Sequence, residues 1–136
     1  MPEQGAMPAL NMPTLSGQVY GLTAAAQQRP VVIASMAGFC GYCKMMAPLL
    51  DKLAEEFKGK DVDFVMAFVD EKPEGVRQIA EAVGIKHAKV AYNAGEAAMA
   101  LGVEGFPAIF LVRGNQVEEW YGYSPNHIEE IRARLK

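Results

Sequence analysis

Apolar residues recur along this chain with two different spacings, and the alternation between the two predicts strands and helices in turn. Two short runs are apolar and rich in β-branched or aromatic residues, which is typical of strands buried on both faces: Val31–Met36 and residues 62–69. Between these runs, over residues 41–57, apolar positions recur at helical spacing with charged residues between them. That pattern predicts an amphipathic helix.

The second half of the chain continues the same alternation. Its elements are expected at residues 74–83 (helix, ending near Gly84), 88–92 (short segment), 95–101 (helix), and 108–112 and 116–121 (strands). Gly114 and Asn115 separate the last two strands and favour a tight hairpin. Ser124 and Pro125 supply a cap and a first-turn proline for a closing helix.

The N-terminal part has a different character. Residues 12–20 form short alternating segments around Ser16 and Gly17, which suits a small hairpin, and a short helix is expected at residues 23–28. We expect residues 1–10 to be a flexible lead-in and residues 11–136 to be one domain. Right-handed crossovers would place helices on both faces of a mixed central sheet whose last strand is antiparallel. The expected class is therefore α/β, with an N-terminal β-hairpin extension.

Composition and charge exclude several classes of protein. The 136 residues suit one domain, and 51% hydrophobic against 21% charged residues indicates a folded chain. The net charge is −3 and the basic residues are scattered, which argues against a nucleic-acid partner. No apolar run reaches the roughly 20 residues that a membrane span needs. The N-terminus lacks signal-peptide features, so we expect a cytoplasmic protein or a domain given without its signal or anchor.

The two cysteines, Cys40 and Cys43, carry the candidate chemistry. They stand where a buried strand passes into a helix, and a two-residue gap is common in redox pairs. The unpaired N–H groups and the dipole at a helix start stabilise a thiolate, which is the attacking species, so Cys40 is expected to attack. Cys43, one turn later, is expected to resolve the mixed disulfide. Gly41 and Tyr42 are expected to contact the substrate.

A zinc site and a pair of merely buried thiols are the other interpretations of the two cysteines. A zinc site wants four ligands, and the only histidines, His87 and His127, follow no zinc-finger spacing. Cysteine is also often merely buried. We therefore expect neither a metal nor a bound cofactor, and His87 is expected to be a solvated loop residue rather than a proton shuttle.

The sequence from Cys40 to Ala54 resembles the active-site helix of the thioredoxin superfamily, including Pro48 inside the helix. Phe106 and Pro107 match the family's cis-proline loop, which faces the cysteines and binds substrate. The resemblance covers residues 12–136, and the hairpin-like entry is similar to the TlpA/ResA-type branch. It implies a thioredoxin fold, protein disulfide substrates, a redox partner protein that recycles the pair, and a periplasmic or otherwise extracytoplasmic location.

Two departures from the family leave the direction of the reaction open. Phe39 and Tyr42 replace the usual tryptophan and proline, and Cys-Gly-Tyr-Cys resembles the motif of periplasmic disulfide isomerases. Ala34 and Met46 stand where family members carry a carboxylate, so we expect Cys43 to lose its proton to water, to substrate, or to a carboxylate that the fold brings near, with Asp70 and Glu71 as the nearest candidates. The main interpretation is a disulfide oxidoreductase; the alternatives are an isomerase or oxidant of the same fold, and a non-catalytic binding module.

Overall fold

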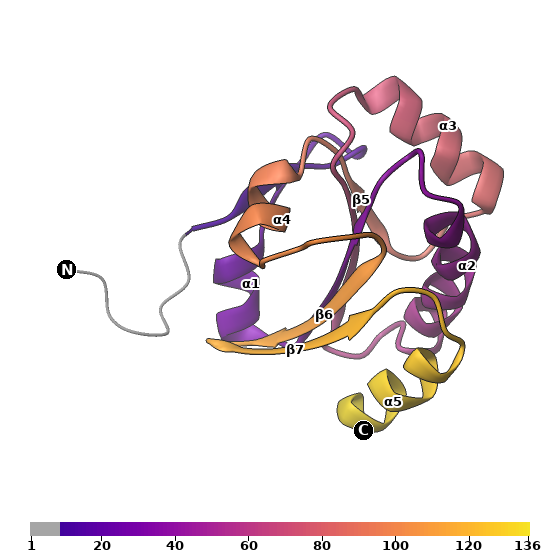
Figure 1. The fold of residues 1–136 in the computed structure, drawn as a ribbon. Coiled ribbons are helices and arrows are strands. Elements are labelled where there is room, and N and C mark those ends of the chain that lie inside the picture. Colours follow the sequence, from indigo (N-terminus) through magenta and orange to yellow (C-terminus); the bar gives the residue numbers. More distant parts are fainter. Residues whose placement is uncertain (1–8) are drawn as a thin grey trace.

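The computed structural model describes residues 9–136, and at its centre lies a five-stranded sheet (Figure 1). Its strands, in spatial order, are β5 (Lys89–Ala91), β4 (Asp63–Phe68), β3 (Val31–Met36), β6 (Ala108–Arg113) and β7 (Gln116–Tyr121). All six residues of β3 are buried, as the continuous apolar run predicts for the middle strand of a covered sheet.

The sheet is mixed, as expected, but one detail of the expectation is wrong. Strands β5, β4 and β3 are parallel to one another, β6 is antiparallel to β3, and β7 is antiparallel to β6. The strand that runs against the other four is therefore β6, not the last strand. The reason is that a tight hairpin joins β6 to β7 and reverses the direction once more.

Helices cover both faces of the sheet (Figure 1). On one face lie α1 (Leu22–Gln28) and α4 (Gly95–Ala100); on the other lie α2 (Gly41–Glu56), α3 (Pro73–Val83) and α5 (Asn126–Leu135). Successive side chains of a strand point to opposite faces, so Val32, Ala34 and Met36 belong to one buried cluster while Val31 and Ile33 belong to another. The first of these clusters contains Cys43.

The N-terminal hairpin also forms, and it extends the sheet at its β5 edge. Strands β1 (Asn11–Pro13) and β2 (Val19–Gly21) are antiparallel. Just after β1, the N–H of Leu15 donates to the carbonyl of Val90 at 2.9 Å, and the N–H of Tyr92 donates to the carbonyl of Pro13 at 3.1 Å. These bonds occupy peptide groups that an edge strand would otherwise leave open.

Residues 1–8 of the expected lead-in lie outside the described residues. Leu10 is buried in the second cluster and its carbonyl accepts the N–H of Leu22 at 2.8 Å, so it forms part of the folded domain. At the other end, α5 begins at Asn126, one residue after Pro125, and the Ser124 hydroxyl accepts the N–H of Asn126 at 3.2 Å. Over residues 9–136, none of the helices has the length and apolar character to cross a membrane.

Candidate active site

Three loops meet at the start of α2: the loop that carries the cysteines after β3, the loop before β6, and the loop after β7 (Figure 1). Cys40 caps α2, with extended backbone angles (φ −95°, ψ 110°). Its sulfur accepts a hydrogen bond from the N–H of Cys43 at 3.1 Å. The sulfur thus takes the place of the side-chain oxygen that usually satisfies an unpaired N–H in the first turn.

The two sulfurs lie at different depths, as the sequence predicts. Cys40 is half-buried, whereas the side chain of Cys43 is 1% exposed and packs in the same cluster as Ala34 and Met46. Burial raises the pKa of the Cys43 thiol to about 12, and its interaction with Cys40 adds to the rise. Cys43 therefore keeps its proton near neutral pH until a base or a higher pH removes it.

The loop before β6 faces Cys40. The Phe106–Pro107 peptide bond is cis, as the resemblance implies, and the thiol of Cys40 donates to the carbonyl of Phe106 at 3.5 Å. Pro107 itself is buried. The fold thus brings four of the predicted substrate and cysteine positions, Cys40, Cys43, Phe106 and Pro107, to one place.

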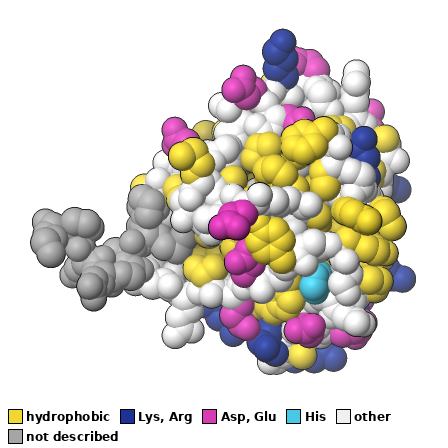
Figure 2. Space-filling model, viewed as in Figure 1, with side chains coloured by type: hydrophobic (Ala, Val, Ile, Leu, Met, Phe, Trp, Pro, Cys, Tyr) yellow, Lys and Arg dark blue, Asp and Glu magenta, His cyan; other side chains and the backbone are white. Residues whose placement is uncertain are grey.

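Aromatic side chains surround the cysteines. Phe39 lies edge-on to Phe106, with ring centroids 6.0 Å apart, and Tyr42 stacks on Tyr123 with centroids 6.1 Å apart and planes 12° from parallel. Phe39 is 84% exposed and Tyr42 is 62% exposed. Figure 2 shows hydrophobic side chains gathered over the part of this view where Figure 1 places the β3–α2 loop and the start of α2.

Tyr123 is a site residue that sequence reasoning missed. It lies in the loop between β7 and α5, far along the chain from the cysteines, and only the tertiary structure brings it to Tyr42. Its one signal in the sequence is an aromatic residue in a Gly-Tyr-Ser-Pro turn, where a polar residue is the usual choice.

The glycine that the local backbone requires is Gly38 rather than Gly41. A β-carbon at Gly41 would meet nothing within 4 Å, and Gly41 does not have a positive φ. A β-carbon at Gly38 would lie 2.5 Å from Asp70 Oδ2 and 2.9 Å from Ile79 Cδ1. Gly38 therefore allows Asp70 to approach the loop closely. The expected contact between Gly41 and substrate stays a prediction.

Asp70, in the loop that follows β4, is the carboxylate that the fold places beside the loop that contains Gly38. Its Oδ1 accepts the N–H of Gly38 at 2.8 Å, while the preceding amide, that of Ala37, interacts with the Cys43 sulfur. The negative charge of Asp70 contributes to the raised pKa of Cys43, so the two groups interact through space. Glu71, the other candidate, is exposed. Between the two, the geometry favours Asp70.

The histidines lie elsewhere. The His87 ring is 3.6 Å from Glu55, and His127 Nε2 is 3.0 Å from the carbonyl of Tyr121. Over residues 9–136, no three His, Cys, Asp or Glu side chains come together as a metal site would require. His87 contacts Glu55 near the end of α2, whereas the cysteines lie at the start of that helix, so His87 is not at the redox pair.

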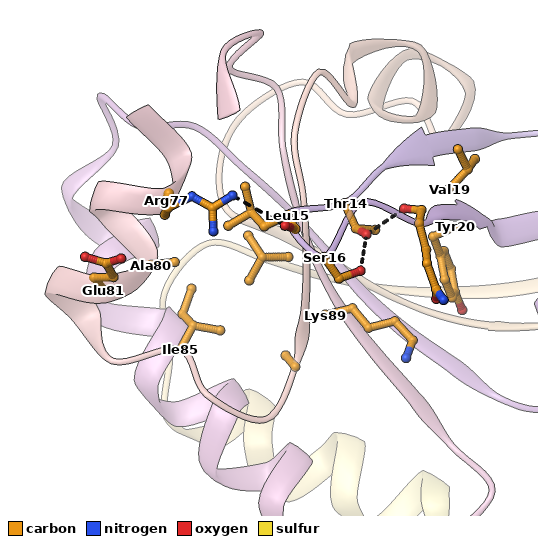
Figure 3. Close-up of a pocket in the computed structure, with 13 residues that line it drawn as sticks. Thr14, Leu15, Ser16, Val19, Tyr20, Arg77, Ala80, Glu81, Ile85 and Lys89 are labelled. Atoms are coloured by element: carbon orange, nitrogen blue, oxygen red, sulfur yellow. Dashed lines mark hydrogen bonds between the residues drawn. The ribbon is translucent and has the colours of Figure 1, made fainter. Parts of the chain in front are cut away.

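A concave pocket of about 420 Å³ lies between the N-terminal hairpin and α3 (Figure 3). Leu15 and Ile85 contribute apolar side chains to it, and Arg77, Glu81 and Lys89 contribute charged ones. Arg77 donates to the carbonyl of Leu15 at 3.4 Å (Figure 3). Neither cysteine lines this pocket, so it is separate from the redox pair.

Comparisons with known proteins agree with this geometry. Residues 2–135 match the Redoxin family. The chain is 30% identical over 108 residues to a thioredoxin of Alicyclobacillus acidocaldarius, covering 79% of each protein. Its fold is similar to that of a secreted Mycobacterium tuberculosis disulfide oxidoreductase (TM-score 0.78, 20% identity, 93% and 96% coverage) and of StoA from Bacillus subtilis (TM-score 0.75, 14% identity, 93% and 97% coverage).

A cysteine pair at a helix start, facing a cis-proline loop on this mixed sheet, defines a thiol-disulfide oxidoreductase of the thioredoxin fold. The chain belongs to the redoxin family and is similar in sequence to thioredoxins.

Proposed function

We propose that this protein exchanges disulfides with polypeptide substrates through Cys40 and Cys43, and that it needs no bound cofactor. The observation that carries the proposal is the pairing of a half-buried Cys40 sulfur, which accepts the N–H of Cys43 at the start of α2, with a buried Cys43 one turn behind it. A hydrogen bond and a helix dipole aimed at one sulfur favour its thiolate. The second sulfur is near enough to displace whatever the first one binds.

In the reducing direction, the Cys40 thiolate attacks one sulfur of a substrate disulfide. A mixed disulfide forms, and the other substrate sulfur leaves as a thiolate and takes a proton. Cys43 then loses its proton and attacks Cys40 Sγ, which forms the Cys40–Cys43 disulfide and releases the second substrate thiolate. Two electrons pass to the substrate. The oxidising direction reverses these steps, and a redox partner protein restores the pair.

The surroundings of the pair favour a polypeptide as substrate. The aromatic side chains beside Cys40 are exposed, and the loop that holds Phe106 and Pro107 offers main-chain groups beside the reacting sulfur. Gly41 leaves room for a substrate because, apart from its chain neighbours and the backbone of its own helix, no atom lies within 4 Å of the position of its missing β-carbon. In this proposal Gly41, Tyr42, Phe106 and Pro107 contact the substrate chain.

Reduction of insulin disulfides by the dithiol form tests the proposal, with Cys40→Ser as the matched inactive variant. Turnover in the wild type that Cys40→Ser abolishes supports an oxidoreductase. Equal and negligible rates in both would favour the alternative, a binding module that keeps the fold without the reaction. The Cys-Gly-Tyr-Cys motif also suits an isomerase or oxidant. The reduction potential of the pair distinguishes those roles, because known reductants and oxidants of this class span about −270 to −120 mV.

We also propose that the protein acts outside the cytoplasm. The similarity to a secreted disulfide oxidoreductase supports this location, since disulfides persist in oxidising compartments. Fractionation of the native host, followed by detection with an antibody, tests it: recovery with cytosolic markers would contradict it.

A further inference from the structure

Two pairs of aromatic side chains lie beside Cys40, where they can contact a bound substrate. One is Phe39 with Phe106 and the other is Tyr42 with Tyr123. In each pair, one ring is largely exposed and belongs to the segment that carries Cys40, while its partner is packed against the buried core. The partner fixes the exposed ring in place, so each pair offers a rigid apolar surface at low entropic cost.

The character of these surfaces favours apolar ligands. None of the four rings carries a charge, and the six ion pairs of the described residues all involve other side chains, such as Arg29 and Arg132. An exposed apolar surface continuous with a reacting sulfur is expected to bind the apolar part of the molecule that the sulfur attacks.

The main chain of the loop before β6, which faces Cys40, indicates how a substrate chain binds. Within the described part of the chain, neither the N–H of Phe106 nor the peptide groups of Gly105 form a hydrogen bond. Unpaired groups at the edge of a loop pair readily with an extended chain, as in β-strand addition. An extended substrate segment can therefore dock there with its cysteine toward Cys40.

The geometry of an extended substrate chain then determines which of its side chains share a face with its cysteine. In an extended chain, side chains alternate between faces, so the residues two before and two after a cysteine share its face, each about 6.6–6.8 Å along the chain. The immediate neighbours point the other way. Phe39 and Tyr42 lie one residue before and two residues after Cys40, and the carbonyl of Phe106 accepts the Cys40 thiol at 3.5 Å, so the two ring pairs border the reacting sulfur.

We propose that the Phe39–Phe106 and Tyr42–Tyr123 pairs select substrate cysteines that have apolar residues two positions before and two positions after them. This inference rests on the proposed exchange reaction and names its substrate class: extended polypeptide segments with apolar residues at these two positions. Each pair serves one of the two positions.

Short peptides with one cysteine, activated as a mixed disulfide with thionitrobenzoate, test the proposal. Attack by Cys40 on the peptide sulfur releases the coloured thiolate, and the Cys43→Ser variant keeps the reaction at this first step. We expect leucine at both second-neighbour positions to react at least about tenfold faster than serine there, which corresponds to about 1.4 kcal/mol. Leucine at the two immediate-neighbour positions should increase the reaction rate much less.

Peptides with leucine at only one of the two second-neighbour positions show which aromatic pair contacts which position. Phe39→Ala should abolish the leucine-over-serine ratio at one second-neighbour position and Tyr123→Ala the ratio at the other. Tyr42→Ala removes the same stack from the opposite side, so it replaces Tyr123→Ala if that variant fails to fold. Met99→Ala, an 82% exposed side chain on α4 at the other face of the sheet, is the control and should keep both ratios.

The outcomes separate the inference from the proposed function. Reaction with all peptides at similar rates, or a preference at the immediate neighbours, overturns the inference and leaves the exchange reaction standing. No release of thionitrobenzoate from any peptide contradicts the proposed function itself. Retention of the ratios in Phe39→Ala and Tyr123→Ala alike would show that other residues choose the substrate.

Discussion

The environments of the two sulfur atoms differ more than their two-residue separation suggests. Cys40 sits at the rim of the site with an N–H on its sulfur, and Cys43 sits in the apolar cluster with Ala34 and Met46. Desolvation favours the neutral thiol, so the buried sulfur is the less reactive one until it is deprotonated.

Alkylation of the reduced protein should therefore modify Cys40 first. At pH 8, a thiol with a pKa of about 12 is thiolate in only about one molecule in ten thousand, so Cys43 of the reduced wild-type protein should react very slowly. The rate of alkylation of Cys43 should increase as the pH rises toward 12. Mass spectrometry of iodoacetamide adducts, taken over time and pH, measures both rates. Faster labelling of Cys43 than of Cys40 would reverse the assignment.

Asp70 has two effects on Cys43 that act in opposite directions. Its negative charge raises the pKa of Cys43, so Asp70→Asn should lower that pKa, measured in the Cys40→Ser background by the ultraviolet absorbance of the thiolate. If Asp70 accepts the proton of Cys43, the same change should nevertheless slow resolution of the mixed disulfide at neutral pH. We expect both results.

The substitution keeps the local contact, because the amide oxygen of asparagine can still accept the N–H of Gly38. Glu71→Gln, the exposed neighbouring acid, is the matched control and should leave the resolution rate near that of the wild type. Faster resolution in Asp70→Asn would mean that Asp70 acts through its charge alone.

At the scale of elements, α2 does more than present the cysteines. The carboxylate of Asp51, on this helix, is 5% exposed and accepts the N–H groups of Lys86, His87 and Ala88 at 3.0, 2.9 and 2.9 Å. These bonds hold the segment between α3 and β5 against the middle of α2. Hydrogen bonds to an ionised group are among the stronger ones in proteins.

Replacing Asp51 should consequently destabilise the fold. Asp51→Ala leaves three N–H groups without this partner, and we expect a loss of about 2–4 kcal/mol in the free energy of unfolding. Asp51→Asn should cost less, since its amide oxygen can keep the bonds to His87 and Ala88. Urea unfolding of the three proteins gives the comparison. Equal stability of wild type and Asp51→Ala would show that the segment is held by other contacts.

At the scale of the whole molecule, the redox state and the stability are linked through Cys43. Folding raises the pKa of this thiol from an ordinary 9.0 to about 12, so the fold favours the protonated form. A group of this kind contributes stability that is fully present below about pH 9 and is lost as the pH rises through about 12. The oxidised protein has no thiol to titrate and lacks this contribution.

The free energy of unfolding of the reduced protein should accordingly fall more steeply between about pH 9 and pH 11 than that of the oxidised protein. Urea unfolding at several pH values, with and without a reductant, measures the difference. Reduced Cys43→Ala should lose the extra slope. Parallel curves for oxidised and reduced wild type would show that Cys43 is not buried as described.

The sequence by itself determined most of the elements and the location of the redox pair, because both depend on short-range signals. Helical periodicity marked residues 41–57, a continuous apolar run marked β3, and the spacing of Cys40 and Cys43 at their junction marked the chemistry. Resemblance to a known family added the cis-proline loop, which no local pattern in this chain could have supplied.

The tertiary structure alone decided which distant residues join the site. Asp51 has the pattern of a solvent-facing helix position, yet the segment at residues 86–88 closes over it; Tyr123 reaches Tyr42 only because β7 returns beside β6. The direction of β6 likewise follows from how the strands pair, and the contact of Asp70 with the N–H of Gly38 follows from how the loops after β3 and β4 lie against each other. Periodicity reports which face of one element is apolar, whereas these contacts depend on how separate elements are packed against one another.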